Sequence, residues 1–183
     1  MNKIKTPHVG FTAYSGTGKT TLLIKLISIL ADKGMRVGII KHAHHTFDID
    51  QPGKDSYELR KAGASEMLIG SVNRWALMVD AEKDQEFSLQ DHIHRLDQDN
   101  LDLILVEGYK LESIPKIELT RPSLGNDLFF PNDDNVIAIA TDEPLNIETD
   151  LPIMDINNPD QIVSFICERF LSNMHKHGQT SAK

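Results

Sequence analysis

The chain has 183 residues, of which 40% are hydrophobic and 25% are charged. A length near that of an average domain predicts one globular domain, and this composition excludes a wholly disordered or fibrous chain. The formal net charge of −8 argues against nucleic acid as the partner, because proteins that bind nucleic acid carry an excess of Lys and Arg. A single cysteine excludes an intrachain disulfide, and no apolar run approaches the roughly 18 residues of a membrane span. We therefore expect a cytoplasmic protein that binds neither nucleic acid nor membrane.

Hydrophobic patterning along the chain alternates strands with helices. In chain order it predicts a strand at 9–14, a helix at 20–33, a strand at 36–41, a short helix from Asp55 or Ser56 to near Gly63, strands at 66–70 and 75–79, a helix at 88–96, strands at 101–106, 116–119 and 136–141, and a helix at 159–171. The Pro-, Asn- and Asp-rich segment 121–135 is the longest predicted loop. Such alternation predicts an α/β fold, a mostly parallel sheet with helices on both faces. We expect one domain over 1–173 and a polar, disordered tail over 174–183.

One motif carries most of the functional information. Residues 13–20 read AYSGTGKT and match the phosphate-binding loop between a strand and a helix, except that Ala13 replaces its first glycine. Consecutive amides of such a loop form a nest for phosphate oxygens, and the helix that follows adds its positive N-terminal end. The predicted nucleotide-binding residues are Ser15, Gly16, Thr17, Gly18, Lys19, Thr20 and Thr21. Lys19 would reach the β- and γ-phosphates, and the Thr20 hydroxyl would bind Mg²⁺. The alternative is a Gly- and Thr-rich turn that matches by chance.

A second predicted strand, LILV, ends in Glu107 and Gly108. Four aliphatic residues are typical of a central parallel strand, and ligands bind at the carboxyl ends of such strands. Glu107 would hold Mg²⁺ through water or orient an attacking water, so Lys19 and Glu107 are the predicted catalytic residues. Gly108 would offer its amide to the γ-phosphate. The alternative is a solvent-exposed strand end.

The strand at 136–141 is followed by Asp142. A carboxylate can accept hydrogen bonds from guanine N1–H and N2–H₂ but not from adenine, whose N1 is an acceptor. Asp142 is therefore a candidate guanine reader. A capping or turn role before Pro144 is the alternative, and the Asn-Lys pair that precedes such an aspartate in many GTPases is absent.

The segment 42–50 places three histidines and two aspartates close together (HAHHTFDID). Three interpretations remain open: a switch or substrate loop that contacts Mg²⁺ or an anion, with Asp50 as a metal ligand; a structural zinc site; and a plain solvated loop. Two further residues have structural interpretations. Cys167 is predicted to be a buried thiol on a helix, and Trp75 a core or interface aromatic.

Taken together, these segments resemble the MobB family of molybdopterin-guanine dinucleotide biosynthesis adaptor proteins. The resemblance extends from about Pro7 to the last helix and rests on the segments AYSGTGKTTL, IIKHAHHTFDIDQPGKDSYELRKAGA, RWALM and LDLILVEGYK. It implies a three-layer P-loop NTPase fold with a mostly parallel sheet and additional strands, similar to dimeric P-loop GTPases.

The resemblance also implies a function. It implies a homodimer that binds GTP with Mg²⁺, hydrolyses GTP slowly, and assists a MobA-type guanylyltransferase that attaches GMP to molybdenum-bound molybdopterin. Contact with molybdopterin itself is a further expectation. Two alternatives use the same phosphate loop: a small-molecule kinase, and a scaffold that binds nucleotide without hydrolysing it.

Overall fold

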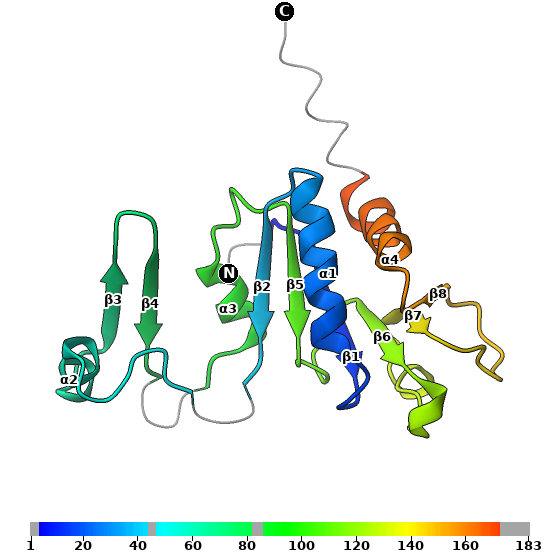
Figure 1. Cartoon of the computed structure of the whole chain (residues 1–183), viewed down its shortest axis with the longest axis horizontal. Helices are drawn as coiled ribbons and strands as arrows, with labels where there is room; N and C mark the ends of the chain where they lie inside the picture. The colour runs from blue at the N-terminus through cyan, green and yellow to red at the C-terminus, as the bar shows by residue number, and fades with distance from the viewer. Residues whose placement is uncertain (1–3, 44–46, 82–85, 173–183) are drawn as a thin grey trace, which may run out of the picture. The chain divides into compact units, whose positions relative to one another are not determined.

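The computed structural model describes residues 4–43, 47–81 and 86–172 (Figure 1). The chain divides into two compact units, which are described separately. Residues 1–42 and 89–183 make up the sheet unit, and residues 43–88 make up the hairpin unit. A single domain over 1–173 stays a prediction, and the predicted tail over 174–183 lies outside the described residues.

The sheet unit is built on six strands in the order β2-β5-β1-β6-β7-β8, and every neighbouring pair is parallel. The strands are β1 (His8–Ala13), β2 (Val37–Lys41), β5 (Leu103–Glu107), β6 (Lys116–Thr120), β7 (Val136–Thr141) and β8 (Ile153–Asp155). This confirms the predicted mostly parallel sheet. The sequence analysis missed β8, a three-residue strand at the edge of the sheet.

Helices cover both faces of this sheet, which makes the three layers. Helix α1 (Lys19–Asp32), seen in front of the sheet in Figure 1, and helix α4 (Pro159–Ile166) pack in one core, and α3 (Leu89–Arg95) packs in the other. Strand β5 shows why: Leu103 and Leu105 join the first core, whereas Ile104 and Val106 join the second. Successive strand residues point to opposite faces, so an unbroken aliphatic run fits a strand buried on both sides.

The predicted helix at 159–171 continues past α4 as a π-helical turn, η3 (Cys167–Leu171). Cys167 packs against the first core but is only partly buried, whereas the sequence predicted a buried thiol. Burial still raises the pKa of its thiol. The predicted loop at 121–135 contains two short 3₁₀ turns, η1 (Pro122–Leu124) and η2 (Phe130–Asn132).

The hairpin unit contains helix α2 (Asp55–Lys61) and the antiparallel strands β3 (Glu66–Gly70) and β4 (Trp75–Val79). Both strands have the bounds predicted from the sequence. Trp75 is 67% exposed, so a core role is wrong and an interface role remains a prediction. No helix in the described part of the chain is long and apolar enough to cross a membrane.

Candidate phosphate-binding site

The phosphate loop joins the end of β1 to the start of α1, as predicted. Gly16 and Gly18 have φ of 83° and 93°, the left-handed region that favours glycine. The Thr17 hydroxyl donates to the Tyr14 carbonyl over 2.9 Å and ties the loop together. Gly18 is the N-cap residue of α1 and has no side chain that could cap the helix. The N–H groups of the first turn therefore remain for a ligand, which is the chemistry of an anion site.

Ser15, Thr20 and Thr21 are exposed along this loop and first turn, whereas Thr17 is buried. The first three residues are thus accessible to solvent and to a bound ligand. The Thr17 hydroxyl is used in closing the loop, so Thr17 can contact a ligand through its backbone amide.

Glu107 ends β5 and lies between two lysines. Its carboxylate is 3.7 Å from Lys19 Nζ and 3.4 Å from Lys41 Nζ, and its side chain is 11% exposed. Strand pairing explains the meeting, because Lys41 is the register partner of Glu107 across β2 and β5. Burial lowers the pKa of Lys19, an effect that the charge of Glu107 partly offsets. A bound phosphate would restore the preference for the charged amine.

The same carboxylate meets the requirements of a Mg²⁺ ligand. Both of its lysine contacts are longer than the roughly 2.7–2.9 Å of a charge-assisted hydrogen bond, so its oxygens keep acceptor capacity. Mg²⁺ prefers hard oxygen ligands, and the Thr20 hydroxyl would supply a second one. Thr20 and Glu107 therefore fit a Mg²⁺ site, and both assignments stay predictions.

Gly108 follows Glu107 with φ of +97°. A Cβ at this position would lie 2.9 Å from the Cβ of His42, so both conformation and space require glycine. The His42 amide donates to the Glu107 carbonyl over 2.9 Å and extends the β2–β5 pairing past both strands. Gly108 as a γ-phosphate donor stays a prediction.

Arg121 is one of the site residues that the sequence analysis missed. It follows β6, donates through Nε to the Thr17 carbonyl over 3.0 Å, and forms an ion pair with Asp142 after β7. Asp142 is thereby tied to the phosphate loop. Its second carboxylate oxygen, Oδ1, is buried and has no hydrogen-bond partner among the described residues. This acceptor is unsatisfied in the structure, and the guanine-reading role stays a prediction.

An aromatic pair adjoins the loop. The rings of Tyr14 and Phe129 stack with centroids 4.5 Å apart and planes at 20°. The Lys110 ammonium lies 5.3 Å from the Tyr14 centroid and 4.9 Å from the Phe129 centroid. Tyr14, Lys110 and Phe129 come from the phosphate loop, the segment after β5 and the segment after β6, so these three residues join the carboxyl ends of three neighbouring strands.

Asp50 belongs to the hairpin unit, where Arg60 Nη2 lies 2.8 Å from Asp50 and 2.6 Å from Asp48. The hydrogen bond with Asp50 raises the pKa of Arg60. As a metal ligand Asp50 stays a prediction, and such a role competes with this ion pair. Among the described residues there is no group of three or more His, Cys, Asp or Glu that could hold a metal, and His44 and His45 lie outside them.

A parallel sheet with a glycine-bearing loop entering a helix at Lys19 defines the class of P-loop nucleotide-binding proteins. The family model "Molybdopterin guanine dinucleotide synthesis protein B" (MobB) matches residues 8–142. Two relatives carry the name "Molybdopterin-guanine dinucleotide biosynthesis adapter protein". The Escherichia coli protein is 49% identical over 91% of this chain and 94% of its own, and the Haemophilus influenzae protein is 44% identical over 92% of each chain.

The crystal structure of Bacillus subtilis MobB has the same fold. It superposes with a TM-score of 0.72 at 23% identity, covering 91% of this chain and 99% of its own. The chain belongs to the MobB family of molybdopterin-guanine dinucleotide biosynthesis adapter proteins, which confirms the resemblance found in the sequence.

Proposed function

We propose that this protein is a GTP-binding adapter that hydrolyses GTP slowly and assists a MobA-type guanylyltransferase in attaching GMP to molybdenum-bound molybdopterin. The observation that carries the nucleotide part is the uncapped first turn of α1, entered through Gly16 and Gly18, with Lys19 directed at Glu107. The names of the relatives support the place in cofactor synthesis. A homodimer and direct contact with molybdopterin belong to the same proposal.

The chain's own groups would act on the nucleotide as follows. Loop amides and the start of α1 bind the phosphates, and Lys19 neutralises the β- and γ-phosphate oxygens. Glu107 either orients the water that attacks the γ-phosphorus or holds Mg²⁺ through water. Mg²⁺, held by Thr20 and in the second case also by Glu107, would supply further charge neutralisation at the phosphate oxygens.

The contacts of Arg121 support the proposal that hydrolysis is slow. Rapid phosphoryl transfer needs an arginine whose charge reaches the transition state. The guanidinium of Arg121, the arginine that contacts the phosphate loop, is engaged by Asp142 and the Thr17 carbonyl. Its charge is largely committed before any nucleotide binds.

Lys19→Ala tests the site. We expect loss of measurable GTP binding by calorimetry, because the variant removes the one side chain that reaches both outer phosphates. Lys25→Ala, an exposed lysine on the same helix, is the matched control and should bind GTP like the parent. Thermal unfolding checks that both variants fold. Unchanged GTP affinity in a folded Lys19→Ala protein would refute the site.

A further inference from the structure

Lys110 brings a positive charge to the phosphate loop that the proposed function does not use. Its ammonium lies beside the Tyr14–Phe129 stack, within about 6 Å of both ring centroids, the range of a cation–π contact. Among the described residues no carboxylate forms an ion pair with Lys110. Tyr14 belongs to the loop itself and is 37% exposed. The charge is therefore held next to the loop and is available to a ligand.

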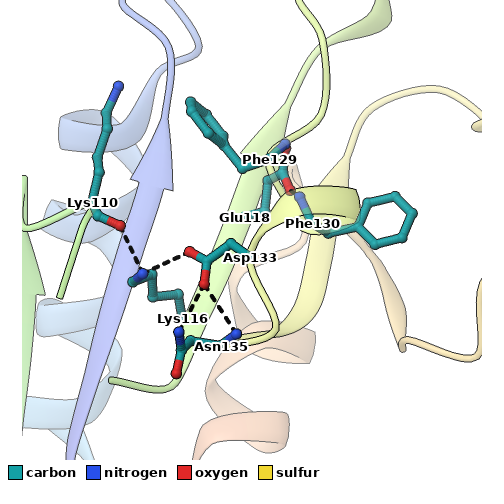
Figure 2. Close-up of polar contacts among 7 residues, drawn as sticks. All are labelled: Lys110, Lys116, Glu118, Phe129, Phe130, Asp133 and Asn135. Atoms are coloured by element: carbon teal, nitrogen blue, oxygen red, sulfur yellow. Dashed lines mark hydrogen bonds and ion pairs between the residues drawn. The ribbon is translucent and has the colours of Figure 1, made fainter. Parts of the chain in front are cut away.

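The backbone of Lys110 is fixed by a buried lysine of β6. Lys116 is 2% exposed, and its ammonium donates to the Lys110 carbonyl over 2.7 Å and to Asp133 over 2.6 Å (Figure 2). One buried cation thus ties the segment after β5 to the segment after β6.

A buried carboxylate two residues further along β6 fixes the aromatic partner. Glu118 is 1% exposed, and its two oxygens accept the amides of Phe129 and Phe130 over 2.8 Å each. Burial raises the pKa of Glu118, and the two amide hydrogen bonds oppose that rise. Figure 2 shows the Phe129 ring and the Lys110 side chain extending to the same side of the cluster, whereas Phe130 points away.

Stability alone does not account for this arrangement. A buried charge loses hydration, and buried ion pairs can often be replaced by apolar side chains with no loss of stability. Lys116 and Glu118 nevertheless occupy the same face of a central strand and are both satisfied. What they achieve is placement: they fix Lys110 and Phe129 against Tyr14.

Three lysine ammonium groups lie near the phosphate loop. Lys19 and Lys41 share the carboxylate of Glu107, and Lys110 adds a third ammonium group. Burial is the largest cause of the lowered pKa of Lys19, and the charge of Lys110 is a smaller cause in the same direction. Such a group of lysines in a protein of net charge −8 is stabilised when an anion binds among them.

We propose that Lys110 is a second phosphate-binding lysine, held in place by the buried side chains of Lys116 and Glu118, which takes a phosphate oxygen beyond those bound by the loop at 15–21. The proposal rests on the proposed function. The oxyanion is either the terminal phosphate of the bound nucleotide or the phosphate of a second ligand, and both have the same chemistry.

The test compares the binding of GTP, GDP and inorganic phosphate to the parent protein, Lys110→Met and Lys110→Arg, with Lys25→Met as the matched control. If the terminal phosphate is the ligand, Lys110→Met weakens GTP about tenfold or more and leaves GDP unchanged, as the loss of one charge-assisted hydrogen bond predicts. If a second phosphate is the ligand, GTP and GDP are unchanged, but inorganic phosphate binds the GDP-loaded protein more weakly. Lys110→Arg keeps the charge and restores most of the affinity. Unchanged affinity for all three ligands in Lys110→Met overturns the proposal.

Positioning is tested through Glu118→Gln and Phe129→Leu. A positioning role predicts that the ligand affected in Lys110→Met is weakened selectively, whereas a merely structural role would weaken GDP as well. If Glu118→Gln does not fold, Phe129→Leu decides, because it removes the stack without touching a buried charge. Should the parent bind neither GTP nor GDP, the proposed function fails, and binding of inorganic phosphate that depends on Lys110 is then the remaining test.

Discussion

At the residue scale, the two carboxylate oxygens of Asp142 have different environments. One oxygen is committed to Arg121, which in turn donates to the Thr17 carbonyl of the phosphate loop. The other oxygen is buried without a partner among the described residues, although an unsatisfied buried acceptor costs about 1–3 kcal/mol. A ligand group with N–H donors would relieve that cost, and guanine presents two such donors on one edge.

We predict that Asp142→Asn lowers the preference for GTP over ATP about tenfold, because the variant loses the charge of the carboxylate that would accept from guanine, and a hydrogen bond to a charged group is worth about 1.5–3 kcal/mol. Competition binding of the two nucleotides measures the ratio. Arg121→Met is the companion variant, since it removes the tie to the loop and leaves the carboxylate. Equal weakening of GTP and ATP in Asp142→Asn would assign Asp142 to holding Arg121 and move the base site elsewhere.

The site residues that could be predicted are those whose signal is local. The loop at 13–20 is contiguous, and Glu107 directly follows an aliphatic strand, so spacing alone indicates both. Arg121, Lys110, Lys116 and Glu118 lack such a signal. An alternating sequence such as KIEL indicates a strand with one polar face in solvent, and only the packing of the segment 121–135 over that face shows that its charges are buried.

At the scale of elements, the segment after β6 is an ordered part of the site. Arg121 and Phe129 each directly precede one of its two 3₁₀ turns and contact the phosphate loop. The anchor of the segment is the ion pair between Lys116 and Asp133. The prediction of a loop from its Pro and Asn content was correct. Composition carries no information about the buried charges that hold such a loop.

Asp133 makes this anchor dependent on pH. Burial alone would raise the pKa of its carboxyl, but hydrogen bonds from Lys116 and Asn135 outweigh burial, and the net pKa is lowered. A lowered pKa stabilises the fold above the ordinary value of 3.8, and this contribution is lost as the pH falls through the folded-state value.

We predict that Asp133→Asn reduces the free energy of unfolding by about 3 kcal/mol at pH 7, because it leaves Lys116 buried without its counter-charge. The difference from the parent protein should shrink as the pH falls below 3.8 toward the lower folded-state pKa, because the parent's carboxyl is then protonated first in the unfolded chain and, at lower pH, in the folded protein as well. Urea unfolding of both proteins at pH 7, 5 and 3 measures this difference in the free energy of unfolding. An equal difference at pH 7 and pH 3 would show that the charge of Asp133 does not matter.

Strand prediction succeeded where side-chain patterning is strong and failed where an element is short. Both strands of the hairpin have the predicted bounds, since they are mostly apolar and enclose a four-residue turn at 71–74. Strand β8 has three residues, too few for a pattern, and is set by its pairing with β7. The π-helical turn after α4 likewise has no local signal.

At the scale of the whole molecule, the hairpin unit carries exposed apolar side chains on one face. Register places Leu68 opposite Leu77, and Trp75 opposite Gly70, so these three apolar side chains share one face of the hairpin. They are 59%, 36% and 67% exposed. A two-stranded sheet is marginally stable alone in water, and its open edges and apolar face are satisfied when a second sheet joins it.

The homodimer of the proposed function supplies such a partner, because the same patch on a second copy is self-complementary about a two-fold axis. We predict that the parent protein sediments as two chains of 20.6 kDa each and that Trp75→Glu weakens the association at least tenfold, as expected for a central aromatic replaced by a charge. Leu111→Glu, at a 99% exposed position of the sheet unit, is the control and should leave the mass unchanged.

Because Trp75 lies outside the phosphate loop, GTP affinity per chain should stay the same in a folded Trp75→Glu protein. A parent protein that sediments as a single chain at all concentrations would refute the dimer, and a dimeric Trp75→Glu protein of parental affinity would move its interface away from the hairpin.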